Sequence, residues 1–273
     1  MVNFFKNLFS KKVDSKSKLD FEESQMEKIK GTNRSSLELV ENWIDENAFQ
    51  HSFFNYGVPD FIKSDINKPI GRALTYTDIM LYLSRKHFPD VRYLELGVSV
   101  GKNFFQMLNA HAKGVFMGFD IEDINPVLER KLNEMSKMEW PTVSGSIKKN
   151  NSSLKRYNFN NLDVSYMSAD IWDQNSWNKL SGSKYNVVFS DALHSPEAIL
   201  FEFEMLVKNE LLDQRFIIIW DDLVGKMKKS FYEIIRKYDK VYKINDIYLL
   251  NVNGWIGENE APHSVGIISN FLL

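Results

Sequence analysis

Acidic residues follow two apolar runs that are typical of neighbouring buried strands. Asp191 follows residues 185–189, and Asp221 and Asp222 follow residues 215–220. The carboxyl ends of adjacent parallel strands lie about 5 Å apart, so the three carboxylates are predicted to meet at one rim of a sheet. Oxygen ligands of this kind suit a hard cation such as Mg²⁺. The competing interpretation is structural, with Asp222 capping the next helix and Asp221 paired to an arginine.

A turn of small residues separates another apolar run from an amphipathic segment. Residues 91–96 are largely apolar, the turn extends from Gly97 to Gly101, and Phe104 begins a set of apolar positions at helical spacing. Glycines let a ligand approach the backbone closely, and the N-terminus of the following helix directs N–H groups at it. The carboxyl end of such a strand is where α/β proteins bind ligands. The pattern therefore predicts a ligand-binding turn.

Two known motifs were compared with this turn. The dinucleotide motif G-x-G-x-x-G requires glycine where this chain has Ser99 and Lys102. The nucleophile-elbow motif G-x-S-x-G is matched by residues 97–101, and a later Asp followed by His263 would complete a Ser-Asp-His order. However, the turn follows the first clear strand, and no His-Gly-Gly-type oxyanion segment precedes it. A serine hydrolase using Ser99 is therefore kept only as the alternative.

The turn resembles the first motif of class I S-adenosylmethionine-dependent methyltransferases, in which an acid, one residue, a glycine, three residues and a glycine close the first strand. Glu95, Gly97 and Gly101 match that spacing, and the resemblance covers roughly residues 70–273. It implies that Asp120, after the second strand, holds the ribose hydroxyls of the cofactor S-adenosylmethionine. The other implied cofactor contacts are Ser99, Ile121, Asp170 and Ile171.

The chemistry of the cofactor agrees with these roles. Ribose hydroxyls need a paired acceptor, which the carboxylate of Asp120 supplies at a strand end. The ammonium group of the methionine part needs an anion or carbonyl oxygens, which Glu95 or the backbone at Gly97 would provide. Taken singly, Asp120 also fits a cap of the segment after it, and Asp170 also fits the end of a turn.

The acids after the fourth and fifth predicted strands resemble those of metal-dependent O-methyltransferases, in the catechol and macrolide-sugar branches. The resemblance implies that Asp191, Asp221 and Asp222 bind a divalent metal, Mg²⁺ being the expected ion. It also implies that His194 and Asp191 are catalytic, with His194 as the general base. The alternative for His194 is a structural cap or a group that orients Asp191. His263 precedes the last strand and is a weaker candidate for the site.

These features predict an S-adenosylmethionine-dependent methyltransferase that acts on a hydroxyl of a small molecule, with a sugar or polyol expected first and a catechol-like phenol second. Besides the serine hydrolase, a non-catalytic nucleoside-binding protein of the same fold is left open. The expected partner is a small hydroxylated molecule and not nucleic acid, since the net charge is only −2. A homo-oligomer is left open.

The order of elements predicts a doubly wound α/β fold, with a mostly parallel seven-stranded sheet that ends in a C-terminal antiparallel hairpin. Residues 1–68 are predicted as a leader and helical extension, and residues 69–273 as the cofactor-binding domain. Within the extension, residues 10–36 are expected to be mobile or loosely helical, and residues 37–49 to form a helix. Residues 142–161 are expected to form a surface loop. The hairpin strands are expected at 241–250 and 264–269.

Composition restricts the remaining classes of function. The chain has no cysteine, which excludes disulfides, thiolate metal sites and cysteine nucleophiles. No apolar run reaches the roughly 18 residues that span a bilayer, so stable membrane insertion is not expected. Residues 1–12 carry phenylalanines among lysines and are predicted to be a frayed terminus or a helix that packs on the domain, with a helix on a membrane surface as the alternative. A cytoplasmic location is expected.

Overall fold

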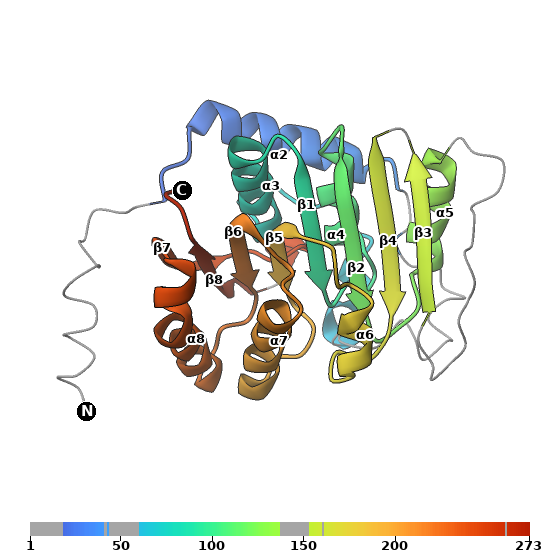
Figure 1. The fold of residues 1–273 in the computed structure, drawn as a ribbon. Coiled ribbons are helices and arrows are strands. Elements are labelled where there is room, and N and C mark those ends of the chain that lie inside the picture. Colours follow the sequence, from blue (N-terminus) through green and yellow to red (C-terminus); the bar gives the residue numbers. More distant parts are fainter. Residues whose placement is uncertain (1–18, 41–42, 44–59, 137–152, 160, 260) are drawn as a thin grey trace.

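The computed structural model describes residues 19–40, 43, 60–136, 153–159, 161–259 and 261–273. These residues contain one eight-stranded sheet with the order β3-β4-β2-β1-β5-β6-β8-β7 (Figure 1). The strands are β1 (Val91–Leu96), β2 (Gly114–Asp120), β3 (Ser153–Phe159), β4 (Leu162–Ser168), β5 (Tyr185–Ser190), β6 (Leu212–Trp220), β7 (Asp246–Val252) and β8 (His263–Ser269). The helices are α2 (Glu23–Leu37), α3 (Tyr76–His87), α4 (Lys102–Asn109), α5 (Pro126–Met135), α6 (Gln174–Asn178), α7 (Pro196–Lys208) and α8 (Lys226–Tyr242), with 3-10 helices η3 (Asp60–Asp65) and η4 (Gly257–Asn259).

The predicted doubly wound arrangement is confirmed. Strands β4, β2, β1, β5 and β6 run parallel, and antiparallel strands flank them at both edges. Helices α2 to α5 cover one face and α6 to α8 the other, each over its own cluster of buried apolar side chains (Figure 1). All five parallel strands therefore end at one rim, where ligands bind in open α/β sheets.

The sheet has eight strands and not the predicted seven, because residues 153–159 form β3. This segment was expected to lie in a surface loop, on the basis of its Asn-, Ser- and Lys-rich composition. It pairs antiparallel with β4 and buries Tyr157 and Phe159 on one face. Lys155, on the same edge strand, pairs with Asp123 and Glu129 at 3.0 and 3.1 Å. Buried aromatic rings at every second position thus indicate a strand, although the average composition of the segment is polar. The rest of the predicted loop lies mostly outside the described residues.

The C-terminal hairpin is confirmed, but its first strand begins later than predicted. β7 and β8 pair antiparallel along their whole length. Residues 241–245 were expected in the strand, yet α8 continues to Tyr242 and Lys243 ends it with a φ of 52°. The ring of Tyr242 packs edge-on against Phe203 of α7, with centroids 6.4 Å apart. The longer helix thus brings a partly buried ring into contact with α7.

The N-terminal extension is more ordered than predicted over its described part. α2 packs on α3 and α4, and Arg34 donates to both carboxylate oxygens of the buried Asp78 at 2.9 and 2.8 Å. The prediction of a helix over 37–49 is wrong at its start, because Leu37 ends α2. Ser36, which precedes that predicted helix, lies inside α2 and donates to the carbonyl of Asn33. Most of residues 41–59, and all of residues 1–18, lie outside the described part.

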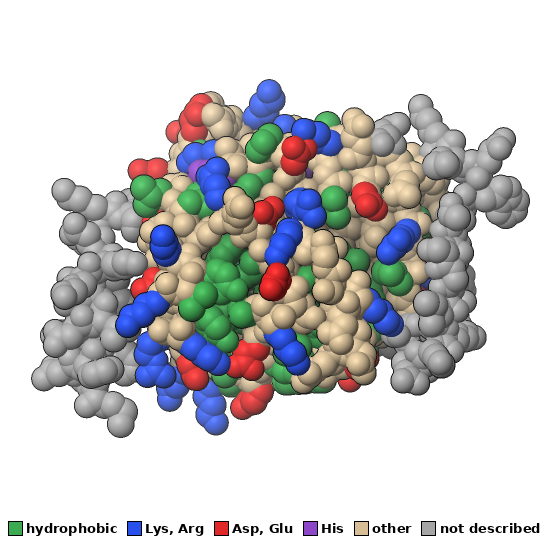
Figure 2. Space-filling view, viewed as in Figure 1, with side chains coloured by type: hydrophobic (Ala, Val, Ile, Leu, Met, Phe, Trp, Pro, Cys, Tyr) green, Lys and Arg blue, Asp and Glu red, His purple; other side chains and the backbone are tan. Residues whose placement is uncertain are grey.

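The molecular surface mixes both signs of charge. Figure 2 shows basic and acidic side chains interspersed around an apolar area on the face in view. Among the described residues, none of the helices is long and apolar enough to cross a membrane.

Candidate functional site

The glycine turn lies where the sequence predicts it, between β1 and α4. Its backbone has positive φ at Gly97, Ser99 and Gly101, with values of 80°, 51° and 84°. A Cβ on Gly97 would lie 2.4 Å from the carbonyl oxygen of Asp191, and one on Gly101 would lie 2.4 Å from Leu128. Gly97 is therefore required by its contact with the backbone of Asp191 as well as by its positive φ, whereas Gly101 is required mainly by its positive φ, since the Leu128 side chain can move. The turn is held tightly against the loop after β5.

Asp120, at the end of β2, faces this turn. Its Oδ2 accepts from the backbone N–H groups of Val98 and Ser99 at 2.6 and 2.8 Å, and its Oδ1 accepts from Glu122 at 2.9 Å. The predicted capping role is thus observed, and the carboxylate also lies against the glycine turn. Oδ2 thus uses both of its lone pairs within the protein, whereas Oδ1 retains one and can still accept from a ligand hydroxyl. Ile121, the next residue, is 46% exposed and offers an apolar surface at the rim.

Glu95 and Asp170 occupy contrasting positions. Glu95 is buried beneath the turn, and its Oε2 accepts from the Tyr93 hydroxyl at 2.6 Å. Burial raises the pKa of Glu95 well above its ordinary value, which favours the neutral acid. Asp170 is exposed after β4 and accepts from the backbone of Trp172, whereas Ile171 is buried in the core. Contact of these residues with a cofactor stays a prediction.

A second group of side chains joins the ends of β5, β6 and β8, and we call it the Asp/His cluster. It consists of Asp191, His194, Asp221, Asp222 and His263. His194 lies 2.9 Å from Asp191 and 3.1 Å from Asp222 through its two ring nitrogens. Nδ1 of His263 lies 2.6 Å from Asp221 and 3.2 Å from Asp222. The three predicted carboxylates therefore converge, linked by two histidines.

The structural alternatives for the cluster acids are not what is found. Asp222 does not cap α8, whose N-cap is Gly225 without a side-chain cap. Asp221 pairs with His263 and not with an arginine. His194 is also not the cap of α7, because Ser195 accepts from the N–H of Ala198 there. The sequence indicated His263 only as a weaker candidate, because its position in the cluster depends on the pairing of β8 with β6 and β7.

Burial and pairing shift the protonation of the cluster. Burial raises the pKa of Asp191, and it raises that of Asp221 to about 7. The hydrogen bond from His194, followed by that from His263, lowers the pKa of Asp222. Burial lowers the pKa of His194, but its bonds to Asp191 and Asp222 outweigh this and raise it to about 11. The cluster thus holds protons that a bound cation would displace.

The donor set of the cluster fits a divalent cation. One ligand atom each from Asp221, Asp222 and His263 lies within 4.8 Å of the other two, whereas Asp191, the third predicted ligand, is not part of this group. Carboxylate oxygens and imidazole nitrogens are common ligands of divalent metals. His194 and Asp222 are 44% and 32% exposed in their side chains, so the cluster is open to a substrate on that side.

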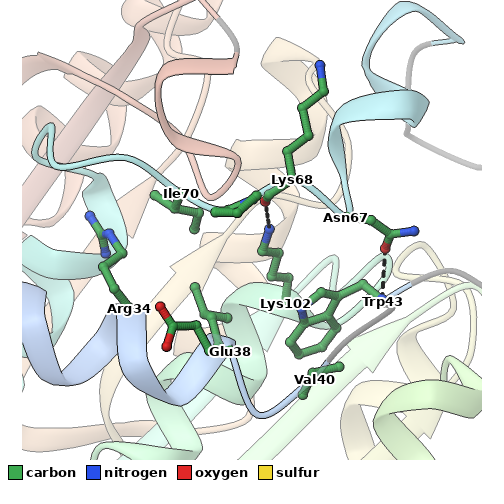
Figure 3. Close-up of a pocket in the computed structure, with 10 residues that line it drawn as sticks. Arg34, Glu38, Val40, Trp43, Asn67, Lys68, Ile70 and Lys102 are labelled. Carbon is green, nitrogen blue, oxygen red and sulfur yellow. Dashed lines mark hydrogen bonds between the residues drawn. The ribbon is translucent and has the colours of Figure 1, made fainter.

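A pocket of about 200 Å³ lies between α2, residues 67–70 and the start of α4. Figure 3 shows Trp43, Arg34 and Lys68 around it, with Lys102 reaching in from the first position of α4. The Lys102 ammonium is buried and donates to the carbonyls of Ile66 and Lys68 at 2.9 and 3.3 Å. Burial, with a further contribution from Arg34, lowers the pKa of Lys102 to about 8. Through these two hydrogen bonds, Lys102 connects the N-terminal extension to α4, the helix that follows the glycine turn.

Comparisons with known proteins give distant likenesses of fold. No family model matches the chain, and no curated protein resembles it in sequence. Solved structures with a similar fold include the O-methyltransferase TomG from Streptomyces achromogenes, at 11% identity and a TM-score of 0.47, over 91% of this chain and 98% of that one. The N-methyltransferase NodS from Bradyrhizobium japonicum has 9% identity and a TM-score of 0.44, over 87% and 98% of the two chains.

A third similar structure is a putative rRNA methylase from Clostridium thermocellum, at 13% identity and a TM-score of 0.46, over 71% of this chain and 95% of that one. The three proteins act on different kinds of acceptor atom or molecule, according to their names. At identities of this size, function has to be inferred from the residues of the site itself.

Glu202 of α7 supports the loop that carries Asp191 and makes stability depend on pH. Its buried carboxyl accepts from the Ser190 hydroxyl at 2.5 Å, and burial raises its pKa from 4.5 to about 8. Between these two values the folded chain keeps a proton that the unfolded chain has lost, so stability falls as pH rises. Glutamine cannot ionise at this position. Between about pH 6 and pH 9, the free energy of unfolding of the wild-type protein is therefore expected to fall by about 2–3 kcal/mol more than that of Glu202→Gln.

Urea unfolding of the two proteins at both pH values measures this difference. Glu204→Gln replaces an exposed carboxylate of the same helix and is the control, expected to follow the wild-type pH dependence. An equal change in the free energy of unfolding of the wild-type protein and of Glu202→Gln between the two pH values would contradict the expectation.

Proposed function

We propose that this chain is an S-adenosylmethionine-dependent methyltransferase that methylates a hydroxyl group of a small molecule. The observation that carries the proposal is the placing of two groups on one rim. Asp120 and the glycine turn lie at the ends of β1 and β2, and the Asp/His cluster lies at the ends of β5, β6 and β8. β1 and β5 are neighbours, so a donor at the turn and an acceptor at the cluster would meet.

Residues of the turn and of the strands beside it are suited to hold the cofactor. When bound, S-adenosylmethionine supplies an electrophilic methyl group on a sulfonium. Oδ1 of Asp120 offers an acceptor lone pair to a ribose hydroxyl, and the exposed Ile121 offers an apolar contact beside it. The exposed Asp170 lies after β4, next to β2 in the sheet, where the adenine is expected. Fixed geometry of this kind contributes to the rate by orienting the two reactants.

Residues of the cluster are suited to bind and deprotonate a hydroxyl. Asp191, Asp221 and Asp222 would hold a divalent cation, which lowers the pKa of a hydroxyl bound to it. Both ring nitrogens of His194 face carboxylates that keep the ring protonated, so the ring has to lose one proton before it can accept another from a hydroxyl. The same carboxylates are the expected cation ligands, so a cation bound to them would weaken their hold on that proton and favour its release. His194 then serves as the general base.

A serine hydrolase is less compatible with the topology. The described residues before β1 contain helices and one isolated bridge but no strand, and Ser99 follows β1 directly. Labelling of Ser99 by a fluorophosphonate would revive that alternative.

The direct test is formation of S-adenosylhomocysteine from S-adenosylmethionine with a panel of acceptors. The panel contains glycosides, polyols and catechols, together with amines and an RNA fragment, each assayed with a divalent metal and with a chelator. Methylation of hydroxyl acceptors that the chelator abolishes supports the proposal. Methylation of only amines or RNA would contradict the hydroxyl substrate, and cofactor binding without turnover on any acceptor would indicate a non-catalytic nucleoside-binding protein.

A further inference from the structure

His263 is a nearly buried member of the Asp/His cluster. It begins β8, and its side chain is only 10% exposed, while that of Asp221 is 1% exposed. Nδ1 points at the two neighbouring carboxylates, 2.6 Å from Asp221 and 3.2 Å from Asp222. A nearly buried imidazole nitrogen thus lies among the oxygens that are expected to bind a cation.

The ring is fixed in this orientation by its surroundings. Tyr76 of α3 packs edge-on against it, with ring centroids 5.8 Å apart, and the N–H of Tyr76 donates to the carbonyl of Asn253. A Cβ on Gly254 would lie 2.7 Å from His263 Nε2, so the absence of a side chain at 254 leaves room for the ring. Because Nε2 faces the backbone at Gly254, Nδ1 is the nitrogen that faces the carboxylates.

The chemistry of this donor set differs from that of an all-oxygen site. Mg²⁺ prefers oxygen ligands and near-octahedral geometry with retained waters. Imidazole nitrogen favours first-row transition metals, whose affinities exceed that of Mg²⁺ for mixed nitrogen and oxygen sites. We propose that His263 binds the cation directly through Nδ1, beside Asp221 and Asp222, and that the site therefore selects a transition cation such as Mn²⁺ over Mg²⁺. This inference rests on the cation site of the proposed function.

Pulsed electron paramagnetic resonance on the Mn²⁺-loaded full chain tests direct ligation. The wild-type protein is expected to show ¹⁴N coupling from a bound imidazole. His263→Gln is expected to lose that coupling and to bind Mn²⁺ at least about 10-fold more weakly. His194→Gln is expected to keep the ¹⁴N coupling, since His263 remains. Competition is expected to require at least about a 10-fold excess of Mg²⁺ to displace half of the Mn²⁺.

A pair of glycine substitutions tests the same point without removing a polar side chain. Gly254→Ala places a methyl group against His263 and is expected to weaken Mn²⁺ binding, because the ring has to move away. Gly31→Ala, on α2, adds a methyl group where nothing lies within 4 Å, and is expected to leave Mn²⁺ binding unchanged. Thermal unfolding of both variants establishes that they fold.

Several results would overturn the inference. These are no ¹⁴N coupling in the wild-type protein, loss of the coupling in His194→Gln with retention in His263→Gln, or equal affinities for Mg²⁺ and Mn²⁺. Titration with S-adenosylhomocysteine in the same preparations separates this failure from that of the proposed function. A protein that binds the nucleoside but shows no ¹⁴N coupling loses only the role of His263, whereas one that binds no nucleoside loses the proposed function.

Discussion

Asp120→Ala is expected to bind S-adenosylhomocysteine at least about 100-fold more weakly than the wild-type protein, because charge-assisted hydrogen bonds to the ribose contribute roughly 1.5–3 kcal/mol each. The substitution also removes the acceptor of the Val98 and Ser99 N–H groups, so the glycine turn loses its hold on β2. Calorimetric titration of both proteins with S-adenosylhomocysteine measures the difference.

Asp123→Ala is the matched control for that substitution. Asp123 is an exposed acid just after β2 and pairs with Lys155 at the surface. It is expected to keep the wild-type affinity for S-adenosylhomocysteine, with thermal unfolding as the check that both variants fold. An Asp120→Ala variant within about threefold of the wild-type affinity would remove Asp120 from the cofactor site.

His194→Ala is expected to lower kcat about 10²- to 10⁴-fold on the acceptor that the panel identifies, since a positioned general base contributes a factor of this size. Affinity for S-adenosylhomocysteine is expected to stay at the wild-type value, because His194 lies at the Asp/His cluster and not at the turn. Steady-state kinetics and calorimetry on the same variant separate these two effects.

His87→Gln is the control for a histidine outside the cluster. His87 ends α3 and packs its ring against Phe271, near the C-terminal end of the chain. This variant is expected to keep the wild-type kcat. Normal turnover in His194→Ala would show that another group accepts the proton, and an equal loss in both variants would point to damage of the fold.

The parallel core of the fold could be predicted from sequence because its signals are local. Continuous apolar runs such as residues 91–96 predict buried strands, and β1 has those same bounds. Ser195 and Pro196 mark the start of α7, as expected for a cap and a first-turn proline. By contrast, β3 forms by pairing with β4, and its polar composition carries no comparable local signal.

The candidate site could be predicted to the same extent and for the same reason. Carboxylates directly after parallel strands must come together once the strand order is known, and Asp191 and Asp221 do so. His263 was a weak candidate, since antiparallel pairing of β8 and space at Gly254 bring it to the cluster. The turn glycines were assigned to ligand approach, but the positive φ at both and the contact of Gly97 with Asp191 also require them, and that contact forms only in the folded structure.

Binding of S-adenosylhomocysteine to the wild-type chain is the most direct test of the central claim that the β1 turn and Asp120 form a cofactor site. Calorimetric titration is carried out with and without a divalent metal. We expect one molecule to bind per chain with micromolar affinity. Absence of binding under both conditions would contradict the methyltransferase function and make Ser99 the next residue to test.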